Sequence, residues 1–166
     1  MVCDDGSMEV GDFIEVQELS ASKALVTLLH LKACTRTSHQ RRIATTDYEV
    51  VVAQALKNLR GLDRSTLGQR LHAGAGKAIA RAVWRDGQPA TRAGCVQFLD
   101  ACTAIELRVV VVQPSLTAAE HARLRNATRV APTHLVQRQQ LDTLLLAADA
   151  NCRALGATFC VVGHDV

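Results

Sequence analysis

The segment at residues 107–113, with the sequence LRVVVVQ, constrains the fold more than any other part of the chain. Its four consecutive valines leave no polar face, so a strand built from them is buried on both sides. Strands of this kind are typical of the centre of a parallel sheet, where helices connect one strand to the next. The segment therefore predicts a central, parallel strand in an α/β protein.

The remaining sequence predicts strands and helices around this centre. Residues 9–17 and 24–33 indicate two strands joined by a turn at 18–23, which is a hairpin pattern. Helices are expected at 48–59, 65–72, 89–103, 117–124 and 133–155, and a last strand is expected at 157–163. Residues 77–84 fit a helix or a strand, and the flanking glycines favour a strand. We predict one domain over residues 1–166, an α/β fold with a mixed β-sheet flanked by helices.

Composition narrows the class of protein. Hydrophobic residues make up 48% of the 166 residues and charged residues 21%, which is typical of a globular domain. Aromatic residues make up only 3%, which argues against a surface that stacks nucleic-acid bases. Six cysteines without a CxxC pair, and no secretory signal, indicate reduced core thiols in a cytoplasmic protein. No apolar run is long enough for a membrane span.

Charge is distributed unevenly near the start of the chain. Residues 1–20 hold six acidic side chains and no lysine or arginine, although the whole chain has a net charge of +3. The following basic strip contains Lys32, Arg36, Arg41 and Arg42. An acidic strip beside a basic strip suits a metal site next to a phosphate-binding surface, and it equally suits a solvated face.

Two polar side chains interrupt the second strand of the predicted hairpin. His30 and Lys32 are two residues apart, so both point to the same face of a strand whose other neighbours are leucines. A lysine at the end of a buried strand needs a reason, and phosphodiester cleavage supplies one. There a carboxylate such as Asp12 holds a divalent metal, and a lysine stabilises the developing charge.

These residues resemble the PD-(D/E)xK superfamily of restriction-endonuclease-like nucleases. Its pattern is an Asp in one strand, then an acidic or polar residue, any residue and Lys in the adjacent antiparallel strand. Here the match is Asp12 in GDFIEV and His30-Leu31-Lys32 in LLHLK. The stretch CDDGSMEVGDFIEV…LLHLK also resembles a subgroup with a DDGxxExxDF strand pair and a His-x-Lys motif. Members of that subgroup are often fused to helicases or found in phage-defence loci.

The resemblance implies a restriction-endonuclease-like core that hydrolyses DNA with Mg²⁺ or Mn²⁺, in phage defence or restriction. It implies a catalytic set of Asp12, His30, Lys32 and Gln54, the last from the helix-forming stretch TTDYEVVVAQALKNL. Asp12 would hold the metal, together with Glu9 if Gly11 forms a bulge that turns both acids to one face. The phosphate contacts would come from Arg36, Arg41 and Arg42. A helicase or another defence-system subunit is the implied protein partner, no membrane is involved, and a homo-oligomer stays open.

Two departures from the pattern leave an alternative open. His30 stands where an acid is usual, and imidazole is a poor Mg²⁺ ligand, although it can bind Mn²⁺, contact phosphate or transfer a proton. The family core also begins with a helix before this strand, and the chain is expected to lack it. The alternative is a catalytically degenerate nuclease-fold module for DNA binding or subunit interaction. In that case Asp12 is a surface acid, His30 a core histidine, Lys32 a strand-end lysine and Gln54 a plain helix residue.

Overall fold

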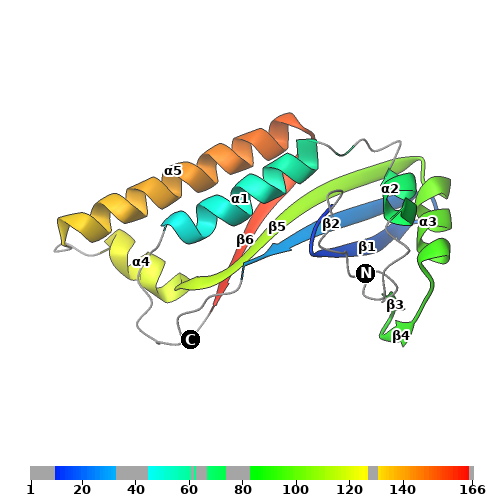
Figure 1. The fold of residues 1–166 in the computed structure, drawn as a ribbon, viewed down its shortest axis with the longest axis horizontal. Coiled ribbons are helices and arrows are strands. Elements are labelled where there is room, and N and C mark those ends of the chain that lie inside the picture. Colours follow the sequence, from blue (N-terminus) through cyan, green and yellow to red (C-terminus); the bar gives the residue numbers. More distant parts are fainter. Residues whose placement is uncertain are drawn as a thin grey trace.

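The computed structural model describes residues 10–32, 45–60, 62, 67–73, 83–126 and 131–164. Its main sheet has four strands, β1 (Phe13–Ser20), β2 (Lys23–Leu31), β5 (Ala104–Thr117) and β6 (Ala157–His164). They lie in the order β1-β2-β5-β6, with β1 antiparallel to β2 and the other neighbours parallel. The chain is therefore an α/β protein with a mixed sheet flanked by helices, as predicted (Figure 1).

The valine strand occupies the predicted place. β5 lies between β2 and β6 and is parallel to both. Val109 and Val111 are fully buried, and Val110 is 9% exposed on the opposite face. The strand is longer than the expected 107–113, because its first residues continue the ladder as far as the pair of Lys23 with Ala104.

The hairpin is also confirmed, with a shorter turn than predicted. The turn occupies residues 21–22 and not 18–23. The strands extend to the pair of Ser20 with Lys23, with a register shift between Glu18 and Ser20. The carbonyl of Ser22 accepts hydrogen bonds from the N–H groups of Thr103 and Ala104, at 2.9 and 3.2 Å. These bonds fix the turn against the start of β5.

All five predicted helices are present, with shifted ends. They are α1 (Thr45–Arg60), α2 (Leu67–Ala73), α3 (Arg92–Ala101), α4 (Ala118–Asn126) and α5 (Pro132–Ala154). α3 starts at Arg92 and not at residue 89, because the Thr91 hydroxyl caps it by accepting the Gly94 N–H at 3.2 Å. α5 starts with a proline, a residue that is favoured in the first turn because its position needs no N–H donor.

The main core lies between the sheet and the helices. Alternate residues of β1, β2 and β5 join buried side chains of α1, α2, α3 and α5 in one hydrophobic cluster. α1 and α5 lie side by side over the sheet, whereas α2 and α3 lie at its other end (Figure 1). The opposite face of the sheet carries large exposed side chains, because Phe13, Leu31 and Val162 are each more than 40% exposed.

Residues 77–82 lie outside the described part, and the expected strand there is represented by a short hairpin. β3 (Trp84–Arg85) pairs antiparallel with β4 (Gln88–Pro89). The two turn residues, Asp86 and Gly87, have φ values of 52° and 78°. A turn with two positive φ values matches the twist of a tight hairpin, which explains the Asp-Gly pair.

The described residues bear on two expectations, one about the cysteines and one about membrane-spanning helices. Cys95, Cys102, Cys152 and Cys160 are free thiols, but only Cys152 is fully buried and Cys160 is exposed, so the prediction of core cysteines is wrong for Cys160. Within the described ranges, no helix is both long enough and apolar enough to cross a membrane.

Candidate functional site

Three of the predicted site residues, Asp12, His30 and Lys32, lie where β2 ends. β2 and β5 run parallel, so their carboxyl ends lie at the same edge of the sheet, and the antiparallel β1 begins there. The chain leaves β2 at this edge and later enters α1, whose first turn contacts the end of β5. In α/β proteins, ligands bind in the crevice outside the carboxyl ends of the strands.

Asp12 lies directly before β1 and not inside it, which corrects its predicted position. Asp12 lies just beyond the last strand pair, Phe13 with Leu29, and its charge lies close enough to His30 to affect that ring. The Asp12 Oδ2 atom accepts a hydrogen bond from the Leu31 N–H at 2.6 Å. Asp12 therefore closes the open end of the hairpin.

His30 is buried on the face of the sheet that the helices cover. Its exposed fraction is 0%, and burial lowers the pKa of its imidazole, while the nearby Asp12 charge partly opposes this effect. The ring is consequently neutral at pH 7, with one donor and one acceptor nitrogen. Neither nitrogen has a hydrogen-bond partner in the part of the chain that the structure describes.

Gly11 allows the chain to pass closely over this imidazole. A Cβ atom at Gly11 would lie 3.6 Å from His30 Nε2 and 3.2 Å from the Leu29 carbonyl oxygen. The second distance is shorter than ordinary van der Waals contact, so a side chain here would push the two strands apart. Glycine at this position leaves room for the His30 ring directly before Asp12.

Lys32 follows β2 and extends beyond the buried core. Its N–H donates to the Val112 carbonyl at 3.1 Å, and its side chain is exposed. Lys32 lies one residue beyond β2, at the same end of the sheet as His30. The cationic group is therefore available to solvent at the edge that Asp12 closes.

A clamp of two hydrogen bonds at the same edge was missed by the sequence reasoning. Gln113 is fully buried, and its Nε2 donates to the Asp47 carbonyl at 3.2 Å. In return the Tyr48 hydroxyl donates to the Gln113 carbonyl at 3.4 Å. Burial and the Asp47 charge raise the pKa of Tyr48 to about 12. In the sequence, the signal for this clamp was Gln113 itself, a polar residue directly after the valine run. It lies two positions beyond Val111, which pairs with His30.

Of the other predicted residues, the structure describes only Gln54. Gln54 is half-buried on α1, six residues beyond Tyr48, which corresponds to about 9 Å further along the helix axis. That distance places it over the middle of the sheet and away from the strand ends. Glu9, Arg36, Arg41 and Arg42 lie outside the described residues.

The described residues set limits on how a metal ion could be held. Among them, no group of three or more His, Cys, Asp and Glu side chains is arranged to bind a metal. Asp12 supplies one carboxylate, and Mg²⁺ is often held by one or two carboxylates with water and substrate phosphates. Imidazole suits Mn²⁺ better than Mg²⁺. The arrangement fits an ion shared with a bound phosphate and does not fit a closed metal cage.

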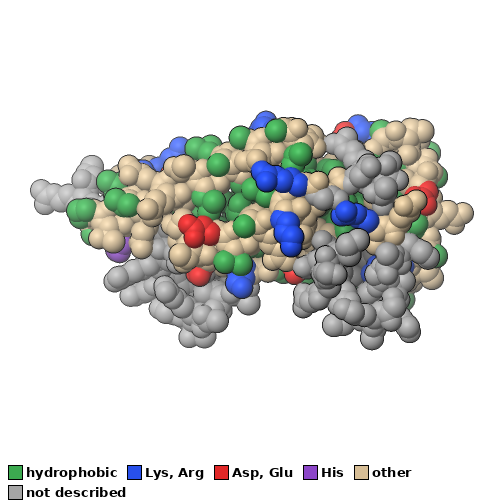
Figure 2. Space-filling model, turned by 45° about the horizontal axis from the view of Figure 1, so that its top comes forward, with side chains coloured by type: hydrophobic (Ala, Val, Ile, Leu, Met, Phe, Trp, Pro, Cys, Tyr) green, Lys and Arg blue, Asp and Glu red, His purple; other side chains and the backbone are tan. Residues whose placement is uncertain are grey.

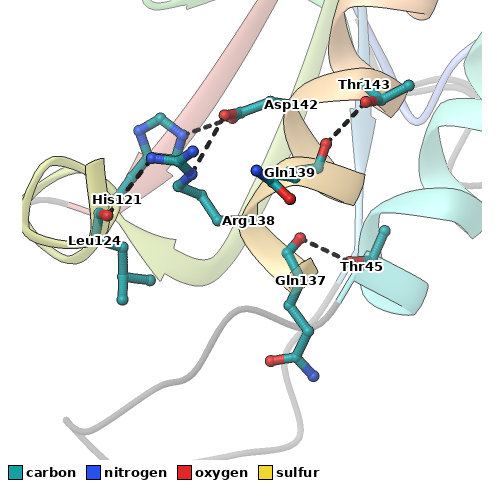
Figure 3. A network of polar contacts seen from close by, with 8 residues as sticks. All are labelled: Thr45, His121, Leu124, Gln137, Arg138, Gln139, Asp142 and Thr143. Atoms are coloured by element: carbon teal, nitrogen blue, oxygen red, sulfur yellow. Dashed lines mark hydrogen bonds and ion pairs between the residues drawn. The ribbon is translucent and has the colours of Figure 1, made fainter. Parts of the chain in front are cut away.

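A second polar cluster joins α4 to α5 (Figure 3). His121 Nε2 lies 2.9 Å from Asp142 Oδ1, and Arg138 Nε lies 3.7 Å from the other oxygen of that carboxylate. The Arg138 guanidinium also donates to the Leu124 carbonyl at 3.5 Å. His121 is only 30% exposed, and its ring is paired with Asp142. These contacts hold α4 against α5.

The chain matches no family model, no curated protein and no solved structure in comparisons with known proteins.

Proposed function

We propose that this chain is a metal-dependent nuclease-type domain with a restriction-endonuclease-like core, which hydrolyses DNA phosphodiester bonds in phage defence or restriction. The observation that carries the proposal is that Asp12 and His30 lie close together at the open end of the hairpin, with Lys32 directly after β2. This placement supports the proposal, because the resemblance expects an acid and a lysine from two adjacent strands at one site. A helicase or another defence-system subunit is the proposed protein partner.

The surroundings of the strand ends favour a phosphate ligand. α1 begins near the carboxyl end of β5, and a helix N-terminus carries partial positive charge that attracts anions. The exposed Lys32 adds a full positive charge at the same edge. Arg36, Arg41 and Arg42 are proposed to extend this surface along the DNA backbone, because phosphate contacts give most of the affinity in such complexes.

Each described residue has a distinct proposed task. Asp12 would hold Mg²⁺ or Mn²⁺, and the bound ion would supply positive charge for the attacking water and the phosphate. Lys32 would stabilise negative charge on the phosphate oxygens. His30 is fully buried, so we assign it a positioning role: it packs beside Gly11 and sets the place of the Asp12 carboxylate. Gln54 is proposed to help position α1 from further along the helix, over the middle of the sheet.

The test is cleavage of supercoiled plasmid by the purified chain with Mg²⁺ or Mn²⁺. Asp12→Asn and Lys32→Ala should each lower the nicking rate by about 100-fold or more, since each removes a group that acts on the reacting phosphate. Glu15→Gln and Lys57→Ala are matched controls, because both side chains are exposed and lie away from the strand ends. Cleavage that survives Asp12→Asn and Lys32→Ala would rule the proposal out.

A second candidate, a catalytically degenerate module for DNA binding or subunit interaction, is favoured by a different observation. Asp12 is already engaged by the Leu31 N–H, and the described residues offer no three-ligand metal group. This module would bind DNA through phosphates, so its affinity should fall steeply with salt and be insensitive to EDTA. Binding with those properties and no cleavage would select this candidate over the nuclease.

A further inference from the structure

The edge of β1 that faces away from β2 borders a groove. β1 is the first strand in the sheet order, so in the described residues no strand pairs with the side that faces away from β2. Such an edge carries a row of backbone N–H and C=O groups that can pair with another strand. A groove of about 760 Å³ runs along residues 13–18, with Trp84, Arg85 and Asp86 of the β3–β4 hairpin as its other wall.

A smaller apolar pocket opens beside this groove, on the helix-covered side of the sheet. It has a volume of about 310 Å³ and lies between β1 and α3. Val16 lines it from the strand, Val83 from the start of the hairpin, and Cys95 and Phe98 from the helix. Groove and pocket share Ile14, Val16, Glu18, Trp84 and Arg85, so they are continuous.

The wall of the groove is held in place by local contacts. The Asp86-Gly87 turn fixes the hairpin, and the Ala90 N–H donates to the Val83 carbonyl at 2.8 Å. Arg85 forms a 3.6 Å ion pair with Glu18, which links the hairpin to β1. Trp84 is 54% exposed at the rim, and exposed tryptophans are the side chains that most often anchor protein partners.

We propose that this edge binds an extended segment of a partner protein, which adds to β1 as a fifth strand of the sheet. Main-chain hydrogen bonds give the affinity in this mode, and pockets for alternate side chains give the specificity. The pocket between β1 and α3 selects an apolar side chain at one position. The neighbouring positions face Glu15 and the open side of the sheet, so basic side chains fit there. The partner segment therefore alternates apolar and basic residues.

The charges of the edge also determine which occupants are disfavoured. Glu15, Glu18 and Asp86 outnumber Arg85 as charged groups along the groove. A second copy of β1 would bring a second Glu15 and Glu18 to an edge that already carries three carboxylates, so this pairing lacks charge complementarity. Nucleic acid is disfavoured for the same reason, because its phosphates would face three carboxylates. The proposed surface is therefore separate from the proposed DNA site at the strand ends.

The probe for this proposal is a capped heptapeptide that alternates lysine and valine, starting and ending with lysine. Trp84 is the only tryptophan in the chain, so a change in its fluorescence reports occupation of the groove. We expect saturable binding of this peptide by the full chain, and no binding of the peptide in which glutamate replaces lysine. No fluorescence response to the lysine–valine peptide at millimolar concentration would overturn the proposal.

Two methylated peptides separate strand addition from simple charge attraction. One carries N-methyl groups on its valines and the other on its lysines, so composition and charge are unchanged. In an added strand only alternate residues direct their N–H groups to the neighbouring strand. One methylated peptide should therefore bind as the parent does, and the other should bind at least about tenfold more weakly. Equal binding of both would exclude a strand at this edge.

A charge reversal on β1 tests the assigned chemistry. Glu15→Lys should weaken binding of the lysine–valine peptide by about two- to fivefold and create measurable binding of the glutamate–valine peptide. Glu49→Lys on α1 is the matched control, since that side chain is exposed on another element and should change neither affinity. If Glu15→Lys left the peptide preference unchanged, the assigned occupant would be refuted. Sedimentation of the chain as a dimer at micromolar concentration would refute it as well.

Discussion

The middle and the carboxyl end of the same strands differ sharply, although they share one face of the sheet. In the middle, Val26 and Leu28 of β2 lie beside Leu107 and Val109 of β5, and all four are almost completely buried beneath helices. At the carboxyl end β2 carries His30, with Lys32 directly after the strand, and β5 carries Gln113. Within β2, only two positions therefore separate a buried apolar side chain, Leu28, from a polar one, His30.

This difference separates the parts of the strands that stabilise the fold from the parts that can carry chemistry. Apolar burial in the middle gives stability without directional requirements. At the end, each buried polar group must find a partner, and Gln113 and Tyr48 do so through the clamp to α1. Within the described residues neither ring nitrogen of His30 has such a partner, and the buried Thr27 hydroxyl in the middle of β2 likewise lacks one.

The largest effect is expected in the middle of the sheet. Leu28→Ala should lower the free energy of unfolding by about 3 kcal/mol, because it leaves a cavity in the main core. Urea denaturation monitored by circular dichroism measures it. Leu31→Ala is the matched control on the same strand, since Leu31 is 41% exposed and should lose less than about 1 kcal/mol. Similar losses for both variants would mean that the middle of the sheet is not the main source of stability.

The next effect is a loss of stability in acid that comes from His30. Burial lowers the pKa of His30 below 6.5, so below that pH the unfolded chain binds a proton that the folded chain does not. Stability should therefore fall as the pH drops below 6.5, by at most about 2 kcal/mol from this residue at pH 5.

His30→Leu isolates this contribution, because it removes the titrating ring and keeps an apolar side chain beside Gly11. The variant should be at least as stable as the wild type at pH 7, and its stability should fall less between pH 7 and pH 5. Thermal unfolding across this range provides the measurement. An unchanged acid slope in the variant would show that the buried histidine is not the destabilising group.

The Tyr48 clamp should contribute less at neutral pH and more in alkali. Tyr48→Phe removes one hydrogen bond, so we expect a loss of about 1 kcal/mol at pH 7. The pKa of Tyr48 is raised to about 12 in the folded chain, so between pH 10 and 12 only the unfolded chain releases this proton, and the wild type loses stability. The variant lacks this alkaline loss.

Tyr48 is the only tyrosine in the chain, so its ionisation can be followed directly by absorbance near 295 nm during an alkaline titration. The folded chain should show its ionisation well above pH 10, and the urea-unfolded chain should show it near pH 10. Coincident titrations in the two states would contradict the burial of the Tyr48 hydroxyl.

The smallest effect is expected where polar groups stay near the surface, as in the cluster between α4 and α5. His121→Asn and Asp142→Asn should each lower stability by about 0.5 kcal/mol, and a double-mutant cycle should give a coupling below about 1 kcal/mol. Figure 2 shows hydrophobic and charged side chains interspersed on the helical face, with no large patch of one sign in the part that is described. A coupling as large as the Leu28→Ala effect would show that this cluster is a structural centre in its own right.

The sequence by itself determined the α/β class, the hairpin, the central parallel strand and all five helices. It did so because hydrophobic periodicity is a local property: the valine run has no polar face, and the pattern in residues 48–59 matches one side of α1. It also predicted that His30 and Lys32 share one side of a strand, which stays a prediction because β2 ends at Leu31. It did not fix the element ends, which depend on caps such as Thr91 and on the neighbouring strands.

Only the tertiary structure decided which polar residues meet. The hydrogen bond from the Leu31 N–H to Asp12 needs the hairpin, the clamp of Gln113 to α1 needs a crossover connection, and His121 meets Asp142 only when two helices pack. Gln54 has a helix position that the sequence predicted, yet the packing of α1 places it over the middle of the sheet. Contacts between distant residues depend on register and packing, which no local pattern encodes, and the open edge of β1 is likewise visible only in the assembled sheet.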